Sequence, residues 1–374
     1  MTAPLPDAWV SVSRSALRHN LDAVRGLVAI PGGPTPQVIA VVKANAFGHG
    51  APETARVFQD AGADFFAVTT LAEALELRAS GIKGRILVFL PPRPDQWEQI
   101  VAFELDATIC DDTSLRGLAQ AARAQGKQAR AHLKVDTGMG RLGVLPDAAL
   151  PLARQIAAEP DMVFAGIYTH FARALEGDDT HVRRQFAVFE QITSRLQNEG
   201  IACGLRHCAN SAALVRFPQM RLDAVRPGTL LYGQYPSASV PRSLDLKETW
   251  TLQARIVVVR DMPRGASVGY GGEWKAARAS RLAVIPIGYA DGFAVAPFSA
   301  QSGWRGIKSL LRGWRGPSVM TTVRGKRVPV VGRIAMQICT VDVSDVPGVQ
   351  AGDIVSLPAR RITTSARLPR LYTD

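Results

Sequence analysis

The stretch Val38-Ile-Ala-Val-Val-Lys43 is an apolar run, rich in β-branched residues, that ends in a lysine. Such a run is typical of a strand that is buried on both faces. Similar runs recur along the chain, and amphipathic segments with helical spacing separate them. The expected strands are Val38–Lys43, Phe65–Val68, Arg85–Leu90, Asp106–Ile109, Ala129–Val135, Met162–Tyr168, Leu205–Cys208 and Leu222–Val225.

Strands that alternate with helices in this way predict an α/β fold, a (β/α)8 barrel of the TIM type. An open, doubly wound sheet is the alternative, but a Gly-rich turn usually follows its first strand, and none follows Lys43. The closed barrel is therefore favoured. The helices are expected at Ser13–Val28, Thr70–Ala79, Thr113–Ala124, Asp147–Ala158 and His181–Gln197.

The pattern of the sequence changes after about residue 240. There is little helical periodicity beyond this point, and short apolar runs are separated by Gly and Pro. Examples are Ala254–Val259, Arg281–Pro286 and Arg327–Val331. We therefore expect a barrel at residues 13–240 and a C-terminal, mostly β domain at residues 241–374. Residues 1–12 are expected to add a strand to this second domain.

The composition fits a folded chain with a large core, because 47% of the 374 residues are hydrophobic and 20% are charged. No run of about 18 apolar residues and no signal peptide is found, so we expect a cytoplasmic protein that does not enter the membrane. The four cysteines form no CxxC pair and no zinc-type spacing. Neither a disulfide framework nor a metal site is therefore expected.

The net charge of +12 could indicate a nucleic-acid partner. Much of the excess lies between Asp291 and Asp342, a stretch without acidic residues. No helix-turn-helix, zinc finger or RNA-binding signature accompanies it, so a solvated basic loop is the favoured interpretation. The basic residues of this stretch are Arg305, Lys308, Arg312, Arg315, Arg324, Lys326, Arg327 and Arg333.

Barrel enzymes carry their chemistry just beyond the carboxyl ends of the strands. Lys43 stands at such a place, and burial disfavours the charged form of a lysine, which suits the formation of a Schiff base. Taken alone, a strand-terminal lysine is more often only a solvated end. Further polar residues at strand ends are Lys134, Asp136, His170, Asn210, Ser211 and Arg226.

The segment Ala40-Val-Val-Lys-Ala-Asn-Ala-Phe-Gly-His-Gly50 resembles the cofactor-lysine motif of alanine racemases, which are fold-type III pyridoxal-phosphate enzymes. Other segments resemble the same family in the same order, and together they cover both expected domains. They are Leu133-Lys-Val-Asp-Thr-Gly-Met-Gly-Arg-Leu-Gly143, Tyr168-Thr-His-Phe-Ala172, Ala209-Asn-Ser-Ala-Ala213, Val225-Arg-Pro-Gly228, Val268-Gly-Tyr-Gly271, Gly288-Tyr-Ala-Asp-Gly292 and Val331-Gly-Arg333.

The resemblance implies that pyridoxal 5'-phosphate is the cofactor and that Lys43 binds it covalently. Arg226, oriented by His170, is then expected to face the pyridine nitrogen and to keep it unprotonated. The phosphate group is expected at the loops after the last two strands, where backbone N–H groups and hydroxyls can donate. The residues expected there are Asn210, Ser211, Gly228 and Thr229.

The resemblance also implies a two-base reaction, because racemisation removes a proton on one face of Cα and delivers one on the other. Lys43 is one base, and Tyr270 from the other subunit is the second, so a homodimer with shared active sites is expected. Arg141 is expected to anchor the substrate carboxylate, and Lys134 matches a lysine that many members carry in carbamylated form. Tyr289 and Met336 are expected to line the substrate entrance.

Four features depart from the family's pattern. Phe47 stands where tyrosine is usual, and Gln337 stands where aspartate is usual. The C-terminus is short, while residues 294–320, which include Trp304 and Trp314, form a longer loop than usual. Lost hydrogen bonds to the cofactor predict weaker cofactor retention, whereas activity is expected to survive.

The implied function is the interconversion of L-alanine and D-alanine, which supplies D-alanine for peptidoglycan. Because of Gln337, a racemase of broader specificity for small amino acids remains an alternative function. A fold-type III amino-acid decarboxylase is the alternative from another reaction class, and a non-catalytic cofactor-binding barrel is a further one. The match to Val268-Gly-Tyr-Gly271 and Gly288-Tyr-Ala-Asp-Gly292 argues against the decarboxylase, and the second domain with Tyr270 argues against the non-catalytic barrel.

Overall fold

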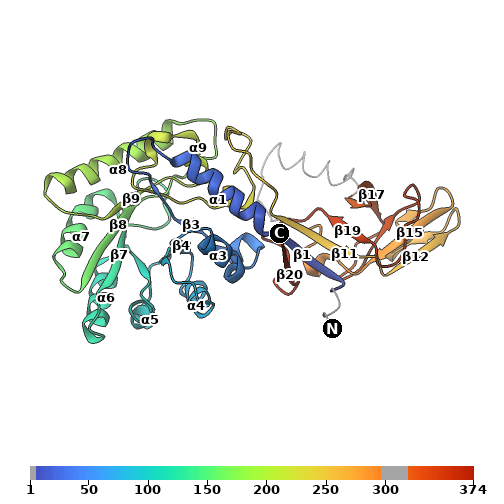
Figure 1. Cartoon of the computed structure of the whole chain (residues 1–374), viewed down its shortest axis with the longest axis horizontal. Helices are drawn as coiled ribbons and strands as arrows, with labels where there is room; N and C mark the ends of the chain where they lie inside the picture. Colours follow the sequence, from blue (N-terminus) through green and yellow to red (C-terminus); the bar gives the residue numbers. More distant parts are fainter. Residues whose placement is uncertain (1–5, 296–318) are drawn as a thin grey trace. The chain divides into compact units, whose positions relative to one another are not determined.

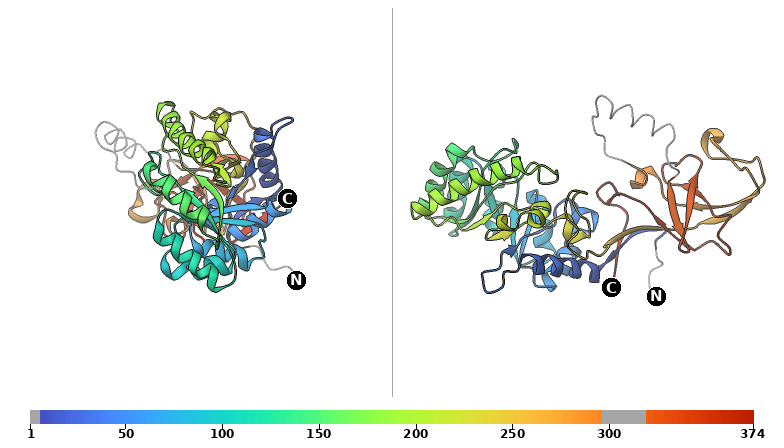
Figure 2. Two further views of the ribbon diagram at one scale, coloured as in Figure 1. Left: turned by 90° about the vertical axis from the view of Figure 1, so that its left-hand side faces the viewer. Right: turned by 90° about the horizontal axis from the view of Figure 1, so that it is seen from above.

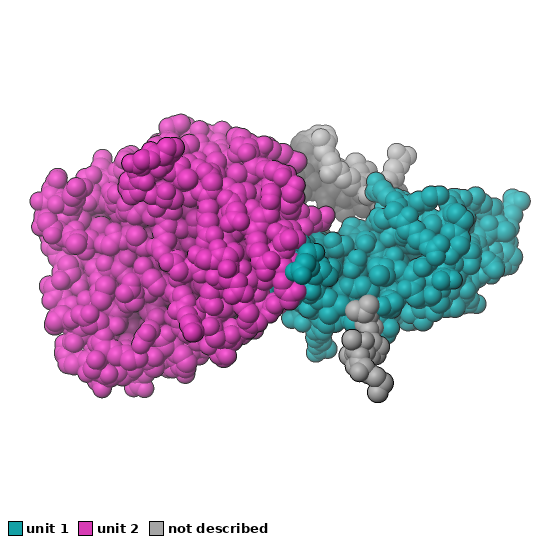
Figure 3. All heavy atoms as spheres, viewed as in Figure 1, with its two compact units in different colours: residues 1–13, 250–374 teal, residues 14–249 magenta. Residues whose placement is uncertain are grey.

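The computed structural model describes residues 6–295 and 319–374 of the chain. Two compact units are distinguished, one made of residues 1–13 and 250–374 and the other of residues 14–249 (Figure 3). Residues 241–249 belong to the second of these, the barrel unit. Trp304 and Trp314, together with Arg305, Lys308, Arg312 and Arg315 of the basic stretch, lie outside the described residues.

The barrel unit contains, within the described residues, a parallel sheet in which β3 to β9 follow one another in sequence order. β10 closes the barrel. It pairs with β2 on one side, and the N–H of Arg226 donates to the carbonyl of Ala209 at 2.9 Å on the other. The expected barrel is confirmed. Its strands are β2 Gln37–Val38, β3 Ala40–Val41, β4 Phe65–Val68, β5 Arg85–Val88, β6 Asp106–Ile109, β7 Ala129–Lys134, β8 Met162–Tyr168, β9 Leu205–His207 and β10 Ala224–Val225.

Helices cover the outside of these strands (Figures 1 and 2). Local signals set where they begin: Thr70 forms a capping box with Glu73, and the carboxylate of Asp111 accepts the N–H of Ser114 at 2.6 Å. None of the described helices is both long and apolar enough to cross a bilayer. The helices are α1 Arg14–Val28, α3 Ala51–Asp60, α4 Leu71–Ala79, α5 Trp97–Ala102, α6 Asp112–Ala124, α7 Pro146–Ala158, α8 Thr180–Asn198 and α9 Ser211–Arg216.

The first strand ends differently from the expectation. Lys43 begins a short turn, α2 Lys43–Gly48, in which Ala44 to Phe47 have left-handed backbone angles with φ between 50° and 55°. Each such residue costs about 1–2 kcal/mol, so tertiary contacts must hold the turn. The N–H of Ala44 donates to Glu73 Oε1 at 2.6 Å, and Asn45 Oδ1 accepts the N–H of Ala51 at 2.8 Å.

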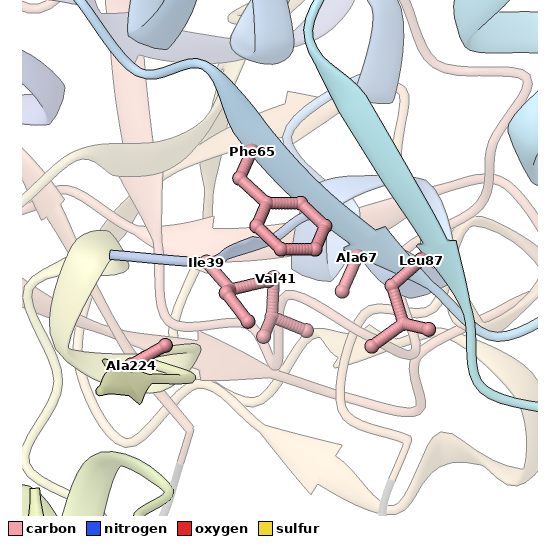
Figure 4. Packing of buried hydrophobic residues seen from close by; sticks show 6 residues of the cluster. All are labelled: Ile39, Val41, Phe65, Ala67, Leu87 and Ala224. Atoms are coloured by element: carbon pink, nitrogen blue, oxygen red, sulfur yellow. The ribbon is translucent and has the colours of Figure 1, made fainter. Parts of the chain in front are cut away.

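The barrel interior has an apolar part and a polar part. Side chains from β3, β4, β5 and β10, together with Ile39 between β2 and β3, form a cluster that excludes water (Figure 4). The strands on the other side, β6 to β9, place polar side chains inward at alternate positions, as the period of a strand requires. The apolar cluster is Ile39, Val41, Phe65, Ala67, Leu87 and Ala224, and the buried polar residues are Asp106, Thr108, His132, Lys134 and His207.

The other unit is mostly β. Within its described residues one sheet has the order β12-β15-β18-β17-β16-β19-β11-β1-β20, so the N-terminal strand lies between two strands that follow the barrel in sequence. The apolar run Ala254–Val259 is divided between two strands, because β11 ends at Arg255 and β12 begins at Val258. The strands are β1 Ala8–Ser13, β11 Trp250–Arg255, β12 Val258–Met262, β13 Ser267–Val268, β14 Trp274–Lys275, β15 Ser280–Ile285, β16 Met320–Val323, β17 Lys326–Val331, β18 Cys339–Asp342, β19 Ile354–Leu357 and β20 Arg370–Thr373.

Candidate active site

A cavity of about 600 Å³ lies at the carboxyl ends of the barrel strands. Apolar side chains form part of its wall, among them Phe89, Met139 and Leu142. Apart from Asp136, the polar residues that the sequence singled out for the barrel all line this one cavity, although their strands are far apart in the chain. They are Lys43, Lys134, Arg141, His170, Asn210, Ser211, Arg226, Gly228 and Thr229.

Lys43 is half-buried in this cavity, two residues after the end of the apolar strand β3. Burial and the nearby Arg141 lower the pKa of its ammonium group, and Glu73 opposes them. A lowered pKa increases the fraction of free amine near neutral pH. Lys43 can therefore act as a nucleophile toward an aldehyde and as an acceptor of protons.

Lys134, at the end of β7, is buried, and its Nζ lies 4.3 Å from the centre of the Tyr168 ring. Burial and the charge of Arg226 hold its pKa well below the ordinary value. Burial likewise lowers the pKa of His170 strongly, and the charge of Arg226 is again the largest electrostatic contribution to this shift. Several cationic groups thus share one cavity, which favours anionic ligands.

Arg141 is held on a loop that Asp136 organises. The carboxylate of Asp136 accepts N–H bonds from Gly138 at 2.9 Å, Met139 at 2.7 Å and Arg141 at 3.1 Å. Burial works to raise the pKa of Asp136, but these backbone donors outweigh it, and the pKa is lowered. The arrangement leaves the exposed Arg141 side chain at the cavity wall.

Arg226 is almost fully buried at 3% exposure. Its Nη1 lies 2.7 Å from Nδ1 of His207, whereas its Nη2 lies 3.5 Å from Nδ1 of His170. The closer imidazole is therefore that of His207, which lies inside an expected strand and not beyond its end. His170 makes the longer contact and lines the cavity.

The loops after β9 and β10 meet at one end of the cavity. Asn210 Oδ1 accepts the N–H groups of Ala212 at 3.1 Å and Ala213 at 3.0 Å, so Asn210 caps α9. Ser211 Oγ accepts the N–H of Gly228 at 2.8 Å. Thr229 Oγ1 is buried without a hydrogen-bond partner in the described part of the chain.

Gly228 allows close packing at this end of the cavity. A Cβ atom there would lie 2.9 Å from the Cζ of Phe47, so any larger residue would displace the phenyl ring. Phe47 also packs against Tyr232, with ring centres 4.8 Å apart. The left-handed turn after Lys43 is thereby joined to the loop after β10.

The three remaining site candidates belong to the other unit, where they are solvent-exposed. Tyr270 is 71% exposed, Met336 58% and Tyr289 52%. The N–H of Tyr289 donates to the carbonyl of Ala335 at 3.2 Å, so Tyr289 and Met336 lie on adjoining segments. Arg333 of the basic stretch pairs with Glu273, a few residues from Tyr270.

Further functional side chains that belong to the strands themselves were not among the expected site residues. Tyr168 stacks on His207 with ring centres 4.8 Å apart, and its hydroxyl lies 2.7 Å from Thr108 Oγ1. His132 and Asp106 lie deeper in the same interior. The sequence does indicate these residues. Buried strands of a parallel sheet are usually apolar throughout, whereas these strands carry polar residues at every second position.

Models of two protein-family domains match this chain. The alanine racemase N-terminal domain matches residues 12–236, and the alanine racemase C-terminal domain matches residues 249–368. Among curated relatives, the alanine racemase of Desulforamulus reducens is 38% identical over 385 aligned positions, covering 97% of this chain and 98% of that protein. That of Sorangium cellulosum is 38% identical and covers 92% of this chain and 86% of the relative.

Solved structures of alanine racemases are also similar. The enzyme of Streptomyces lavendulae has a TM-score of 0.83 and 32% identity, with 99% of this chain and 98% of that chain covered. A Bacillus anthracis alanine racemase structure with bound L-Ala-P has a TM-score of 0.82 and 28% identity, with 100% and 96% covered. With both domains matched and nearly the full length aligned, this chain belongs to the alanine racemase family.

Proposed function

We propose that this protein is a pyridoxal-phosphate-dependent racemase that interconverts L-alanine and D-alanine in the cytoplasm. The D-alanine would be used for peptidoglycan. Membership of the family, whose enzymes depend on this cofactor, supports the reaction. The observation that carries the proposal is the single cavity that unites Lys43, Arg141 and Arg226. Both domains match alanine racemase models, so neither the decarboxylase nor the isolated cofactor-binding barrel is supported.

The residues of the cavity fit the cofactor. The buried Thr229 Oγ1 lacks a partner among the described residues, and the space beside Gly228 admits no side chain, as a phosphate-binding corner requires. Ser211 lies at the same corner. Lys43 would bind the aldehyde, and Arg226 would donate to the pyridine nitrogen. Bound pyridoxal phosphate supplies an electron-withdrawing ring that acidifies the proton on the substrate's Cα.

The chain's own residues then carry out the proton transfers. Arg141 holds the substrate carboxylate, since a guanidinium can bind both of its oxygens. One of Lys43 Nζ and Tyr270 Oη takes the proton from one face of Cα, and the other delivers a proton to the opposite face. Which base acts first depends on the enantiomer bound. Tyr289 and Met336 limit the size of the side chain that enters.

A homodimer with shared active sites follows from this division of roles. Tyr270, Tyr289, Met336 and Ile338 are all more than half exposed on the second unit. Exposed apolar side chains that gather on adjoining segments commonly mark a surface that another subunit covers. We propose that this face of one subunit completes the cavity of its partner.

Lys134 is the proposed site of carbamylation. Its low pKa, caused by burial and by Arg226, leaves a free amine that attacks carbon dioxide; an N–C bond forms and one proton is released. The resulting anion would lie near Arg226 and Arg141, both of which act on Lys134 electrostatically.

The carbamate gives a direct test. Protein equilibrated with ¹³C-labelled bicarbonate is expected to show a carbamate carbonyl resonance that is missing from Lys134→Gln. Lys127→Gln is the matched control, because Lys127 is only half-buried and pairs with the exposed Glu104. An equal resonance in Lys134→Gln would contradict the assignment.

The pKa of Lys43 predicts two opposite pH shifts. Covalent attachment of pyridoxal phosphate needs the free amine, and the charge of Arg141 lowers the Lys43 pKa while Glu73 raises it. In Arg141→Gln the Lys43 pKa rises, so the midpoint of the attachment rate moves to higher pH. In Glu73→Gln it falls, so the midpoint moves to lower pH. The rate at which cofactor absorbance rises after rapid mixing, followed against pH, gives the midpoint for each variant. Shifts of the two midpoints in the same direction would refute the electrostatic explanation.

The two-base reaction predicts the effect of removing one hydroxyl. With added pyridoxal phosphate, the wild type is expected to convert L-alanine in deuterated water into D-alanine that carries deuterium at Cα. Tyr270→Phe is expected to lose about 10²- to 10⁴-fold in racemisation. Chiral analysis and mass spectrometry measure both products. Tyr235→Phe, which loses a hydroxyl bonded to Leu244, should keep most activity; racemisation by Tyr270→Phe at the rate of this control would exclude Tyr270 as a base.

Shared sites predict complementation between two inactive variants. In a mixed dimer of Lys43→Ala and Tyr270→Phe, one site has both wild-type residues and the other has neither. After random exchange half of the dimers are mixed, so about one quarter of the wild-type activity should return. Steady-state racemisation before and after exchange measures this. Verified subunit exchange without any gain would show that each site uses its own subunit's tyrosine.

A further inference from the structure

A row of buried polar side chains crosses the barrel interior and ends at Arg226. Asp106, at the start of β6, His132 in β7 and His207 in β9 all have 0% exposure. Asp106 Oδ2 lies 2.9 Å from His132 Nε2, and His132 Nδ1 lies 3.0 Å from His207 Nε2. His207 Nδ1 lies 2.7 Å from Arg226 Nη1. The four residues therefore form one uninterrupted hydrogen-bonded row.

Only one placement of protons satisfies this row. A guanidinium has donors and no acceptor, so His207 Nδ1 must be unprotonated to accept from Arg226. The His207 proton is then on Nε2 and is donated to His132 Nδ1. His132 in turn carries its proton on Nε2 and donates it to Asp106. Both imidazoles are neutral, in keeping with the lowering of both pKa values by burial.

The far end of the row is an anchored anion. Asp106 is paired with Arg85 and, at 3.0 Å, with Arg130 Nε. Burial acts to raise the pKa of Asp106, but His132 and Arg85 outweigh it and lower the pKa to about 2. Arg85 Nη2 also lies 3.3 Å from His132 Nε2, and both are donors toward the same carboxylate. Asp106 is therefore the acceptor that gives the row its direction.

The surrounding strands make room for the row. A Cβ atom on Gly166 would fall 2.4 Å from His132 Nδ1, so the glycine in β8 admits the ring. The register of β7 and β8 shifts between Ala131 and His132. The Tyr168 ring stacks on His207 with an angle of 5° between the ring planes. These contacts restrain both imidazoles to one orientation.

The row determines which donor of Arg226 is left for the cavity. Nη1 donates to His207 Nδ1 and to the His207 carbonyl at 2.9 Å. Nη2 donates to the carbonyls of Thr169 at 2.7 Å and Cys208 at 3.2 Å. The described residues thus accept all four Nη hydrogens, and no described acceptor faces Nε–H. Arg226 lines the cavity, so this donor is available to a ligand there.

We propose that Asp106, His132 and His207 are positioning residues whose fixed imidazole protons hold Arg226 in a single orientation, with Nε–H directed at the heterocyclic nitrogen of the ligand. The part of this inference that concerns the ligand rests on the proposed function. The proton placement does not, because the contacts within the chain determine it alone. The effect on the reaction is indirect, through the geometry and charge of Arg226.

The proton placement is tested on the unaltered protein. NMR of protein labelled with ¹⁵N in the histidine rings separates protonated from unprotonated ring nitrogens. His132 and His207 are each expected to carry one proton, on Nε2, at neutral pH. His132→Gln and His207→Gln assign the signals. A His207 ring protonated at Nδ1, or at both nitrogens, overturns the proposal without any functional assay.

A reversal of the row tests its consequence. In Asp106→Asn the amide oxygen is expected to accept hydrogen bonds from Arg85 and Arg130. The NH₂ group then faces His132 Nε2. Both imidazoles should then switch their proton to Nδ1, which places a donor against Arg226. We expect kcat for alanine to fall roughly 10- to 100-fold, as for other residues that orient a catalytic group. KM should stay within about twofold, because Arg141 binds the carboxylate.

The row can also be altered while its direction is kept. In His132→Gln the amide oxygen can accept from His207 and the NH₂ group can donate to Asp106, whereas His132→Phe can do neither. His132→Gln should therefore retain kcat and the His207 proton on Nε2, and His132→Phe should lose both. Equal loss in the two variants would indicate packing alone and overturn the proposal, even if Asp106→Asn does not fold.

Asp223→Asn is the matched control, because Asp223 pairs with Arg206 at 2.8 Å in the same barrel and has no histidine among its hydrogen-bond partners in the described part of the chain. It should leave the histidine protons and kcat unchanged. The ring nitrogen of bound ¹⁵N-labelled pyridoxal phosphate is the readout at the ligand: its signal should shift in Asp106→Asn and not in Asp223→Asn. If the wild type does not racemise alanine, the proposed function fails, and the histidine signals still decide the row.

Discussion

The burial of the Arg226 charge is the constraint on which the rest of the cavity depends. Among the described residues no carboxylate pairs with this guanidinium; carbonyl groups and neutral imidazoles surround it instead. A buried ion needs such partners, since an unsolvated charge is costly. Because neutral dipoles stabilise the charge without cancelling it, its field still acts on the cavity. The strongly lowered pKa values of Lys134 and His170 both reflect it, after burial itself.

The division of the barrel interior follows from the same constraint. Strands β3 to β5 with β10 close one side with apolar side chains, and β6 to β9 carry the polar row on the other. Arg85 lies at the border, with its guanidinium 4.1 Å from the centre of the Phe65 ring while it pairs with Asp106. The apolar side excludes water, and a low dielectric strengthens every hydrogen bond of the polar side.

Much of the fold could be predicted from the sequence, because buried parallel strands leave long β-branched runs and the helices between them have clear periodicity. The barrel and the change to a mostly β unit were visible in this way. The polar residues at strand ends could be listed for the same reason, since a barrel gathers those ends on one face. The resemblance to alanine racemases supplied the roles that spacing alone leaves open.

The remainder depends on contacts between residues that are distant in the chain. His207 looks like an ordinary strand residue until the partner of each ring nitrogen is known, and those partners come from β7 and from the loop after β10. The left-handed turn is hidden for a similar reason: Ala44 and Phe47 have no preference for that backbone, and Glu73 and Gly228 make it possible. Tertiary structure overrides local preference at both places.

The left-handed turn after Lys43 has a consequence for the newly synthesised chain. Its four non-glycine residues would rarely adopt this backbone unaided, so the surroundings of the lysine exist only once the neighbouring loops are in place. An unfolded or truncated chain presents Lys43 as an ordinary, fully charged amine. The chemical hazard of a reactive lysine in a cell rich in aldehydes and ketones is thus confined to the finished barrel, where Lys43 is half-buried in the cavity.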